Sequence, residues 1–204
     1  SRIYVDKSML LHELNQLLNT EDCFVCVARP RRFGKSMAGN MIAAYYSKSA
    51  NSRPLFENLK IAQFPDFETY LNAFNVIKFD VNGFFSNSNG KKNTVPMFTA
   101  KIREELIEEF PECGLKKSWS LADCIAQIYK KTKKKFVLII DEYDVLVREK
   151  VNASIFDPYL AFLNGMFKNA DLAPAFALIY LTGVLPVVRD KIQSKLNLFR
   201  EYTM

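Results

Sequence analysis

Glycine and histidine are scarce in this chain of 204 residues, which holds seven glycines and one histidine. With 49% hydrophobic and 25% charged residues, so little glycine excludes a collagen-like or disordered chain and favours one globular domain. The only histidine, His12, lies on an expected amphipathic helix with no acid or cysteine cluster near it in the sequence. We therefore expect a surface or packing role for His12 and no Ser/His/Asp triad.

Disulfide staples and membrane spans are not expected either. The longest mostly apolar stretch, residues 175–188, is shorter than the about 20 residues that a membrane span needs. The cysteines form no even ladder and no secretory signal precedes them, which predicts reduced thiols and a cytoplasmic protein. A Cys-x-x-Cys at Cys23 and Cys26 would point to opposite faces of a strand, so we expect core thiols rather than metal ligands. The net charge of +6 favours phosphate-bearing partners without identifying one.

Short apolar runs alternate with segments of helical periodicity along the chain. We expect an irregular connection over 54–65, an exposed loop over 86–94, and Asp6 or Ser8 capping the first helix. The expected strands are residues 22–28, 76–80, 136–140 and 176–182, and the expected helices are 7–18, 35–47, 66–74, 96–110, 121–131 and 156–167. Repeated alternation of this kind predicts an α/β fold with a parallel sheet covered by helices on both faces.

The first strand leads into Arg-Pro-Arg-Arg-Phe-Gly-Lys-Ser at residues 29–36, and a helix begins at the Gly-Lys-Ser. In such a loop, backbone N–H groups surround a phosphate, the lysine reaches the β- and γ-phosphates, and the serine hydroxyl ligates Mg²⁺. The usual pattern has a glycine where this chain has Arg29. We predict a nucleotide-binding segment made of Pro30, Arg31, Arg32, Phe33, Gly34, Lys35, Ser36 and Met37.

Two acids and a threonine end the later buried strands. Asp141 is expected to bind Mg²⁺, and Glu142 to polarise the water that attacks the γ-phosphate. Thr182 closes another strand, where it either contacts the γ-phosphate or the water, or satisfies its own backbone in a Thr-Gly turn. Ligands bind at these carboxyl strand ends in open α/β sheets.

Three charged features keep alternative interpretations. Arg31 and Arg32 either neutralise nucleotide phosphates or form an exposed pair of charges. Asp144 is more often a cap or an ion-pair partner at such a position than a metal or water ligand. The lysine run within residues 130–135 either touches nucleic acid or, as is usual for charge runs, lies in solvent at a helix C-terminus.

These motifs resemble the AAA-ATPase-like domain family of microbes, often found with a PD-(D/E)xK nuclease-like domain downstream. The resemblance rests on Ile-Tyr-Val-Asp-Lys-Ser at 3–8, the phosphate loop at 29–36, Ile-Asp-Glu-Tyr-Asp at 140–144, Leu-Thr-Gly-Val-Leu-Pro at 181–186 and Ser-Lys-Leu-Asn at 194–197. The Arg29 variant is similar to that family's own phosphate loop.

The resemblance implies a P-loop ATPase of the additional-strand type with strand order 5-1-4-3-2, in which residues 199–204 contribute the fifth strand. It implies ATP and Mg²⁺ as cofactors, with Glu142, Lys35 and Thr182 catalytic and Ser36 and Asp141 on the metal. We expect residues 1–204 to be one domain of a longer protein, without its lid and nuclease-like domain, and partners to be a homo-oligomer or that downstream domain. A nucleotide-dependent switch with little hydrolysis and a nucleic-acid-associated module are the alternatives.

Overall fold

The computed structural model describes residues 6–30, 34–88, 92–185 and 198–202. The strands among these residues form one parallel sheet. Its strands are β1 (Phe24–Ala28), β2 (Asn75–Asp80), β3 (Phe136–Asp141), β4 (Phe176–Gly183) and β5 (Arg200–Tyr202). Their order across the sheet is β2-β3-β4-β1-β5, which is the predicted order read from the other edge. All the strand pairs are parallel, so the predicted fold class is confirmed.

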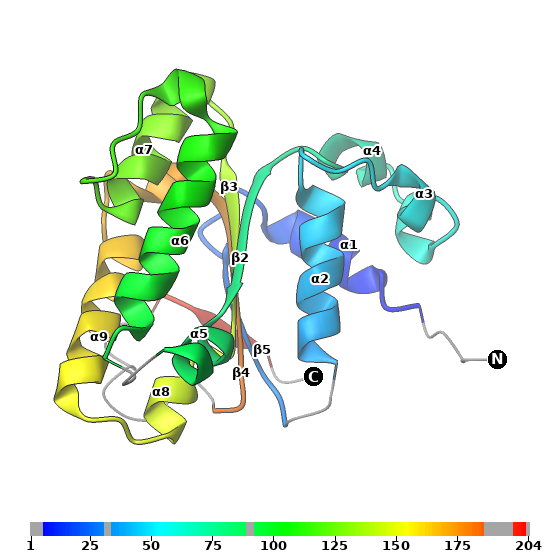
Figure 1. Cartoon of the computed structure of the whole chain (residues 1–204). Helices are drawn as coiled ribbons and strands as arrows, with labels where there is room; N and C mark the ends of the chain where they lie inside the picture. Colours follow the sequence, from blue (N-terminus) through cyan, green and yellow to red (C-terminus); the bar gives the residue numbers. More distant parts are fainter. Residues whose placement is uncertain (1–5, 31–33, 89–91, 186–197, 203–204) are drawn as a thin grey trace.

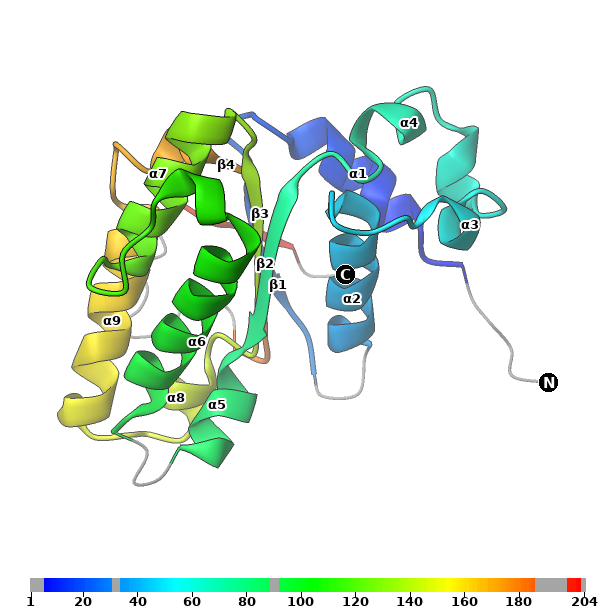
Figure 2. The same cartoon turned by 45° about the horizontal axis from the view of Figure 1, so that its top comes forward.

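Helices cover both faces of the sheet. Figures 1 and 2 show α1 (Met9–Leu17) and α2 (Lys35–Tyr46) on one face, with the short α3 (Arg53–Phe56) and α4 (Phe67–Tyr70) beyond them. The other face carries α6 (Thr94–Glu109), α7 (Leu121–Thr132) and α9 (Ala153–Phe167). The remaining elements are the short helices α5 (Val81–Asn87) and α8 (Val145–Arg148) and the 3-10 turns η1 (Lys60–Gln63), η2 (Pro111–Cys113) and η3 (Ala173–Ala175).

Alternate side chains of each central strand enter different cores, because successive residues of a strand face opposite sides. In β3, Leu138 and Ile140 join the core under α6, α7 and α9, whereas Val137 and Ile139 join the core under α1 and α2. Every residue of β3 and β4 is buried. This explains why both strands are nearly continuous apolar runs in the sequence.

Several local predictions are wrong. The stretch predicted as irregular contains α3 and η1, and α5 extends into the segment predicted as a loop. Neither Asp6 nor Ser8 caps α1 with its side chain. Instead, the Asp6 carboxylate accepts hydrogen bonds from the backbone N–H groups of Ser8 and Lys60, and the Ser8 hydroxyl accepts one from the N–H of Ile61. These groups therefore bind η1 to the start of α1, a long-range contact that local sequence does not reveal.

The cysteine and histidine predictions are confirmed. All four cysteines are free and buried, and burial raises the pKa of the Cys26 thiol to about 12. The His12 ring stacks on Phe64 with 3.8 Å between ring centroids, and its Nδ1 lies 3.8 Å from a carboxylate oxygen of Asp66. Within the part of the chain that the structure describes, no helix is long and apolar enough to cross a membrane.

Candidate functional site

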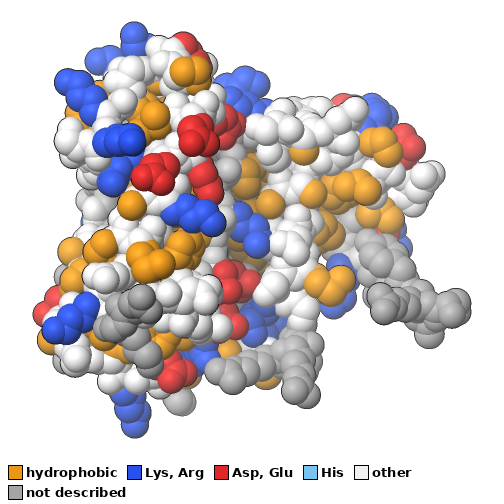
Figure 3. All heavy atoms as spheres, in the orientation of Figure 1, with side chains coloured by type: hydrophobic (Ala, Val, Ile, Leu, Met, Phe, Trp, Pro, Cys, Tyr) orange, Lys and Arg blue, Asp and Glu red, His pale blue; other side chains and the backbone are white. Residues whose placement is uncertain are grey.

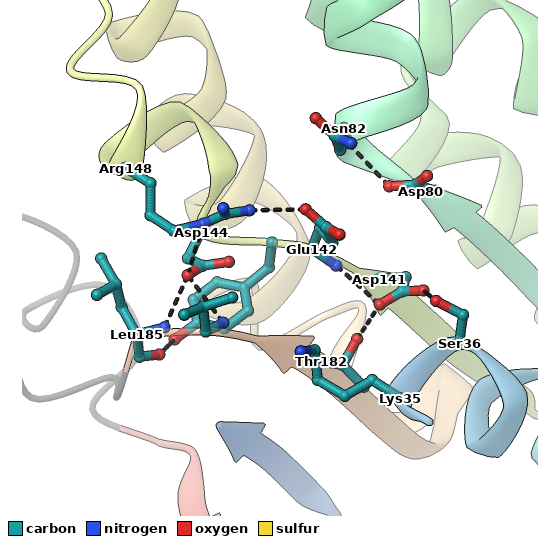
Figure 4. A network of polar contacts seen from close by, with 12 residues as sticks. Lys35, Ser36, Asp80, Asn82, Asp141, Glu142, Asp144, Arg148, Thr182 and Leu185 are labelled. Carbon is teal, nitrogen blue, oxygen red and sulfur yellow. Dashed lines mark hydrogen bonds and ion pairs between the residues drawn. The ribbon is translucent and has the colours of Figure 1, made fainter. Parts of the chain in front are cut away.

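Five of the predicted site residues gather at the carboxyl ends of the parallel strands, where α2 begins (Figure 4): Lys35, Ser36, Asp141, Glu142 and Thr182. Asp141 ends β3 beside Asp80 of β2, and Thr182 of β4 lies opposite Val27 of β1. The parallel register therefore places residues that are distant in sequence along one edge of the sheet.

The Lys35 side chain reaches back to the residues that follow β1. Gly34 precedes α2 with a positive φ of 77°, a backbone conformation that glycine adopts at little cost. The Lys35 ammonium donates hydrogen bonds to the carbonyl oxygens of Arg29 and Pro30, at 2.8 and 2.9 Å. Ser36 and Met37 follow in the first helical turn, and both are exposed. The predicted loop residues Arg31, Arg32 and Phe33 lie outside the described residues.

Asp141 connects three elements of the site. Its side chain is buried, and one carboxylate oxygen accepts a hydrogen bond from the Ser36 hydroxyl at 2.5 Å. The other oxygen accepts from the Thr182 hydroxyl and from the N–H of Glu142. Thr182 is buried as well, so its hydroxyl joins the acid rather than its own backbone turn. A carboxylate and two hydroxyls thus converge between α2, β3 and β4.

These oxygen atoms fit Mg²⁺, a hard cation that takes oxygen ligands. In the described residues, no group of three or more His, Cys, Asp or Glu side chains is arranged to hold a metal. Nucleotide sites do not require such a group, because Mg²⁺ there uses one or two protein ligands and completes its shell with phosphate oxygens and water. Ser36 and Asp141 are the pair that would hold it.

Glu142 has an ion-pair partner that the sequence analysis missed. One of its carboxylate oxygens accepts a hydrogen bond from an Arg148 guanidinium nitrogen at 2.6 Å, and its backbone has a positive φ of 51°. The Arg148 guanidinium also pairs with Asp144, with 3.2 Å between Nε and Oδ2. The ion-pair interpretation of Asp144 is therefore confirmed. The spacing of four residues between Asp144 and Arg148 was the available signal, since such residues meet on a helix.

The turn after β4 packs tightly against Tyr143 and Asp144. A Cβ atom on Gly183 would lie 2.6 Å from a ring carbon of Tyr143 and 2.8 Å from a carboxylate oxygen of Asp144. The Asp144 carboxylate accepts hydrogen bonds from the N–H groups of Val184 and Leu185, at 3.0 and 2.8 Å. The Tyr143 hydroxyl donates to the carbonyl of Leu185, and burial raises the pKa of that hydroxyl. Only glycine fits between these groups.

Asp80 is a third acid at this edge, and the sequence analysis did not select it. Its carboxylate accepts a hydrogen bond from the N–H of Asn82 at 2.9 Å and so caps α5. Burial raises the pKa of Asp80, and the nearby charges of Asp141 and Glu142 raise it further. Asp80 is the last residue of the strand expected over 76–80, and this position at a carboxyl strand end was the available signal. The register of β2 on β3 places it beside Asp141.

A family comparison agrees with this geometry. The model of a family described as predicted AAA-ATPase matches residues 1–193. The chain belongs to this AAA-ATPase-like family. A comparison with curated proteins finds no match to the chain.

The lysine run lies far from the predicted ATPase site of this AAA-ATPase-like chain. Lys130 and Lys131 lie in the last turn of α7, and Lys133 follows the helix. The run thus comes just before the first residue of β3, whereas Asp141 is the last residue of that strand. Most of these lysines are exposed. On the face that Figure 3 shows, basic and acidic side chains are interspersed. The run therefore lies at the amino end of the sheet and takes no part in the site.

Proposed function

We propose that this chain binds ATP with Mg²⁺ and hydrolyses it to ADP and phosphate. The main support is that Lys35, Ser36 and Asp141 lie together where α2 begins, at the carboxyl ends of the strands. The chain also belongs to a family of predicted AAA-ATPases. The N–H groups at the helix start and the Lys35 ammonium supply positive charge for the phosphates.

Each residue has a distinct role in the proposed reaction. Lys35 exchanges its two carbonyl partners for the β- and γ-phosphate oxygens of ATP. Ser36 and Asp141 hold Mg²⁺, which supplies charge stabilisation on the phosphate oxygens when it is bound. Glu142 orients a water molecule and accepts its proton as the water oxygen attacks the γ-phosphorus and ADP leaves. Thr182 donates a hydrogen bond to one oxygen of the Asp141 carboxylate and so orients the other oxygen toward Ser36.

One observation favours a second candidate, a nucleotide-dependent switch with slow turnover. The Glu142 carboxylate is paired with Arg148, so one of the oxygens that would orient water already has a partner. Such a chain binds ATP firmly but hydrolyses it slowly.

The test measures binding of a fluorescent ATP analogue and phosphate release on the same samples. We expect Lys35→Ala to weaken binding by about 10- to 100-fold, because a charge-assisted hydrogen bond contributes about 1.5–3 kcal/mol. Glu142→Gln should bind normally and lose about 100-fold or more of turnover. Lys134→Ala removes the same charge from the far end of the sheet and serves as the matched control. Equal binding by Lys35→Ala and Lys134→Ala would refute the assignment of the phosphate loop.

A further inference from the structure

The Arg148 guanidinium lies between two carboxylates that differ in burial. On one side it binds Glu142 at 2.6 Å, and on the other it pairs with Asp144 at 3.2 Å. Asp144 is nearly completely buried, whereas the side chain of Glu142 is 26% exposed. Asp144 is therefore the buried acid of this trio, and Glu142 is the acid whose side chain reaches solvent.

Backbone contacts hold the Asp144 carboxylate in place. The Asp144 carboxylate accepts two N–H hydrogen bonds from Val184 and Leu185, the residues that follow β4. Tyr143 and Asp144 also lie close to Gly183, where an added Cβ would be 2.8 Å from an Asp144 oxygen. Arg148 is only 11% exposed, so its guanidinium is largely shielded from water and its ion pairs are weakly screened. The position of Arg148 is thus set by the turn after β4.

This arrangement directs Glu142 away from the phosphate-binding residues. Figure 4 shows the Glu142 carboxylate turned toward Arg148 and away from Lys35 and Ser36. A glutamate that orients the attacking water must face the γ-phosphate, which lies near Lys35. Glu142 Oε2 is held by the guanidinium, so the carboxylate cannot turn toward the γ-phosphate without breaking this pair. The pair with Arg148 therefore opposes the catalytic position of Glu142.

We propose that Arg148 is a positioning residue that holds Glu142 in a resting position and so limits ATP turnover. The inference rests on the proposed ATPase function and adds a control on it. Because Asp144 binds the residues directly after Thr182 and Gly183, a movement of that turn is carried through Asp144 to Arg148 and releases Glu142. The chain thereby couples the end of β4 to the residue that orients water.

Steady-state phosphate release with Arg148→Met tests the effect on turnover. Methionine keeps much of the alkyl packing and removes the charge, and a melting curve confirms that the variant is folded. We expect kcat to rise about tenfold, because the loss of one charge-assisted hydrogen bond shifts Glu142 from the paired to the released position by about that ratio. KM for Mg-ATP should stay within about twofold of the wild-type value. Arg148→Lys retains a positive charge and should return kcat toward the wild-type value. Arg148→Met combined with Glu142→Gln should be as inactive as Glu142→Gln alone.

Three results of these turnover measurements would overturn the inference. One is a folded Arg148→Met variant that binds ATP but has wild-type or lower kcat. Another is an equal rise in kcat for Arg148→Met and Arg148→Lys, which would separate the effect from the ion pair. The third is a rise that persists when Glu142 is replaced by glutamine. Absence of ATP binding in the wild type would instead refute the proposed function.

A nucleotide-free double-mutant cycle tests the pair independently of ATP. The unfolding equilibrium constants of the wild type, Glu142→Gln, Arg148→Met and the double variant are measured in urea. We expect the joint effect to fall short of the product of the single effects by about fivefold, because residues in contact do not act additively. The matched control combines Arg148→Met with Glu105→Gln, where Glu105 is an exposed acid on α6. The effects of these two substitutions on the unfolding equilibrium constant should multiply. Multiplicative behaviour of the Glu142 cycle would show that the pair is not formed and would overturn the inference.

Discussion

Substitution of Gly183 by alanine should destabilise the protein strongly. The added Cβ would lie 2.6 Å from a ring carbon of Tyr143 and 2.8 Å from an Asp144 oxygen, both on buried side chains. The backbone of Gly183 is in a strand and its φ is not positive, so alanine is not strained in itself. The cost therefore comes from the clash, and overpacking of this kind costs about 1–3 kcal/mol.

Relief of the clash carries a further cost at Asp144. If its carboxylate moves aside, it weakens the hydrogen bonds to Val184 and Leu185, and a bond to a charged group contributes about 1.5–3 kcal/mol. We expect a total loss of about 3 kcal/mol in the free energy of unfolding, or about 6–12 °C in melting temperature for a domain of this size.

Urea unfolding followed by circular dichroism measures this loss. Gly165→Ala is the matched control, because Gly165 is an exposed residue inside α9 with nothing within 4 Å of an added Cβ. Alanine there should stabilise the protein by about 0.5–1 kcal/mol through helix propensity. A Gly183→Ala variant as stable as the wild type would refute the packing of the β4 turn on Tyr143 and Asp144.

Three further predictions concern the helix caps, the thiols and the metal ligands. Ser120→Ala removes the capping box at the start of α7 and should lower the free energy of unfolding by about 1 kcal/mol, measured in urea. Burial raises the pKa of all four thiols, so a disulfide reagent at pH 8 should react slowly with each thiol of the folded protein. All four should react after unfolding, and a fast-reacting thiol in the folded protein would contradict this. Ser36→Ala should reduce the increase in ATP-analogue affinity that Mg²⁺ produces, and an unchanged Mg²⁺ effect would remove Ser36 from the metal site.

The strands were predictable because their burial is complete. Phe136–Asp141 and Phe176–Gly183 are buried at every residue, and such strands appear in the sequence as unbroken apolar runs. The order of the strands came from the family resemblance, since no property of a single run states which neighbour it pairs with. Four-residue helices such as α3 and α8 were missed because so short a helix depends on tertiary contacts rather than on a periodic pattern.

The site also combines contacts that sequence patterns predict with contacts that depend on the tertiary structure. Ser36 and Asp141 end or begin elements at the same edge of a parallel sheet, so their meeting follows from the fold. The partner of Glu142 does not follow from the fold, because a positive φ at Glu142 turns the chain and directs the side chain toward α8. Asp80 reaches the site through its register with Asp141. The ion pair of Asp144 could be predicted from sequence, whereas the bond from Arg148 to Glu142 could not, because it depends on the turn at Glu142.

We propose an ATPase in which Glu142 orients the attacking water. The most direct measurement is phosphate release from Mg-ATP by the wild type beside Glu142→Gln, with binding of a fluorescent ATP analogue measured on the same samples. We expect equal binding by both proteins, turnover in the wild type, and a loss of turnover of about 100-fold or more in the variant. Equal turnover by the two proteins would contradict the role of Glu142, and no binding by either would contradict the nucleotide site.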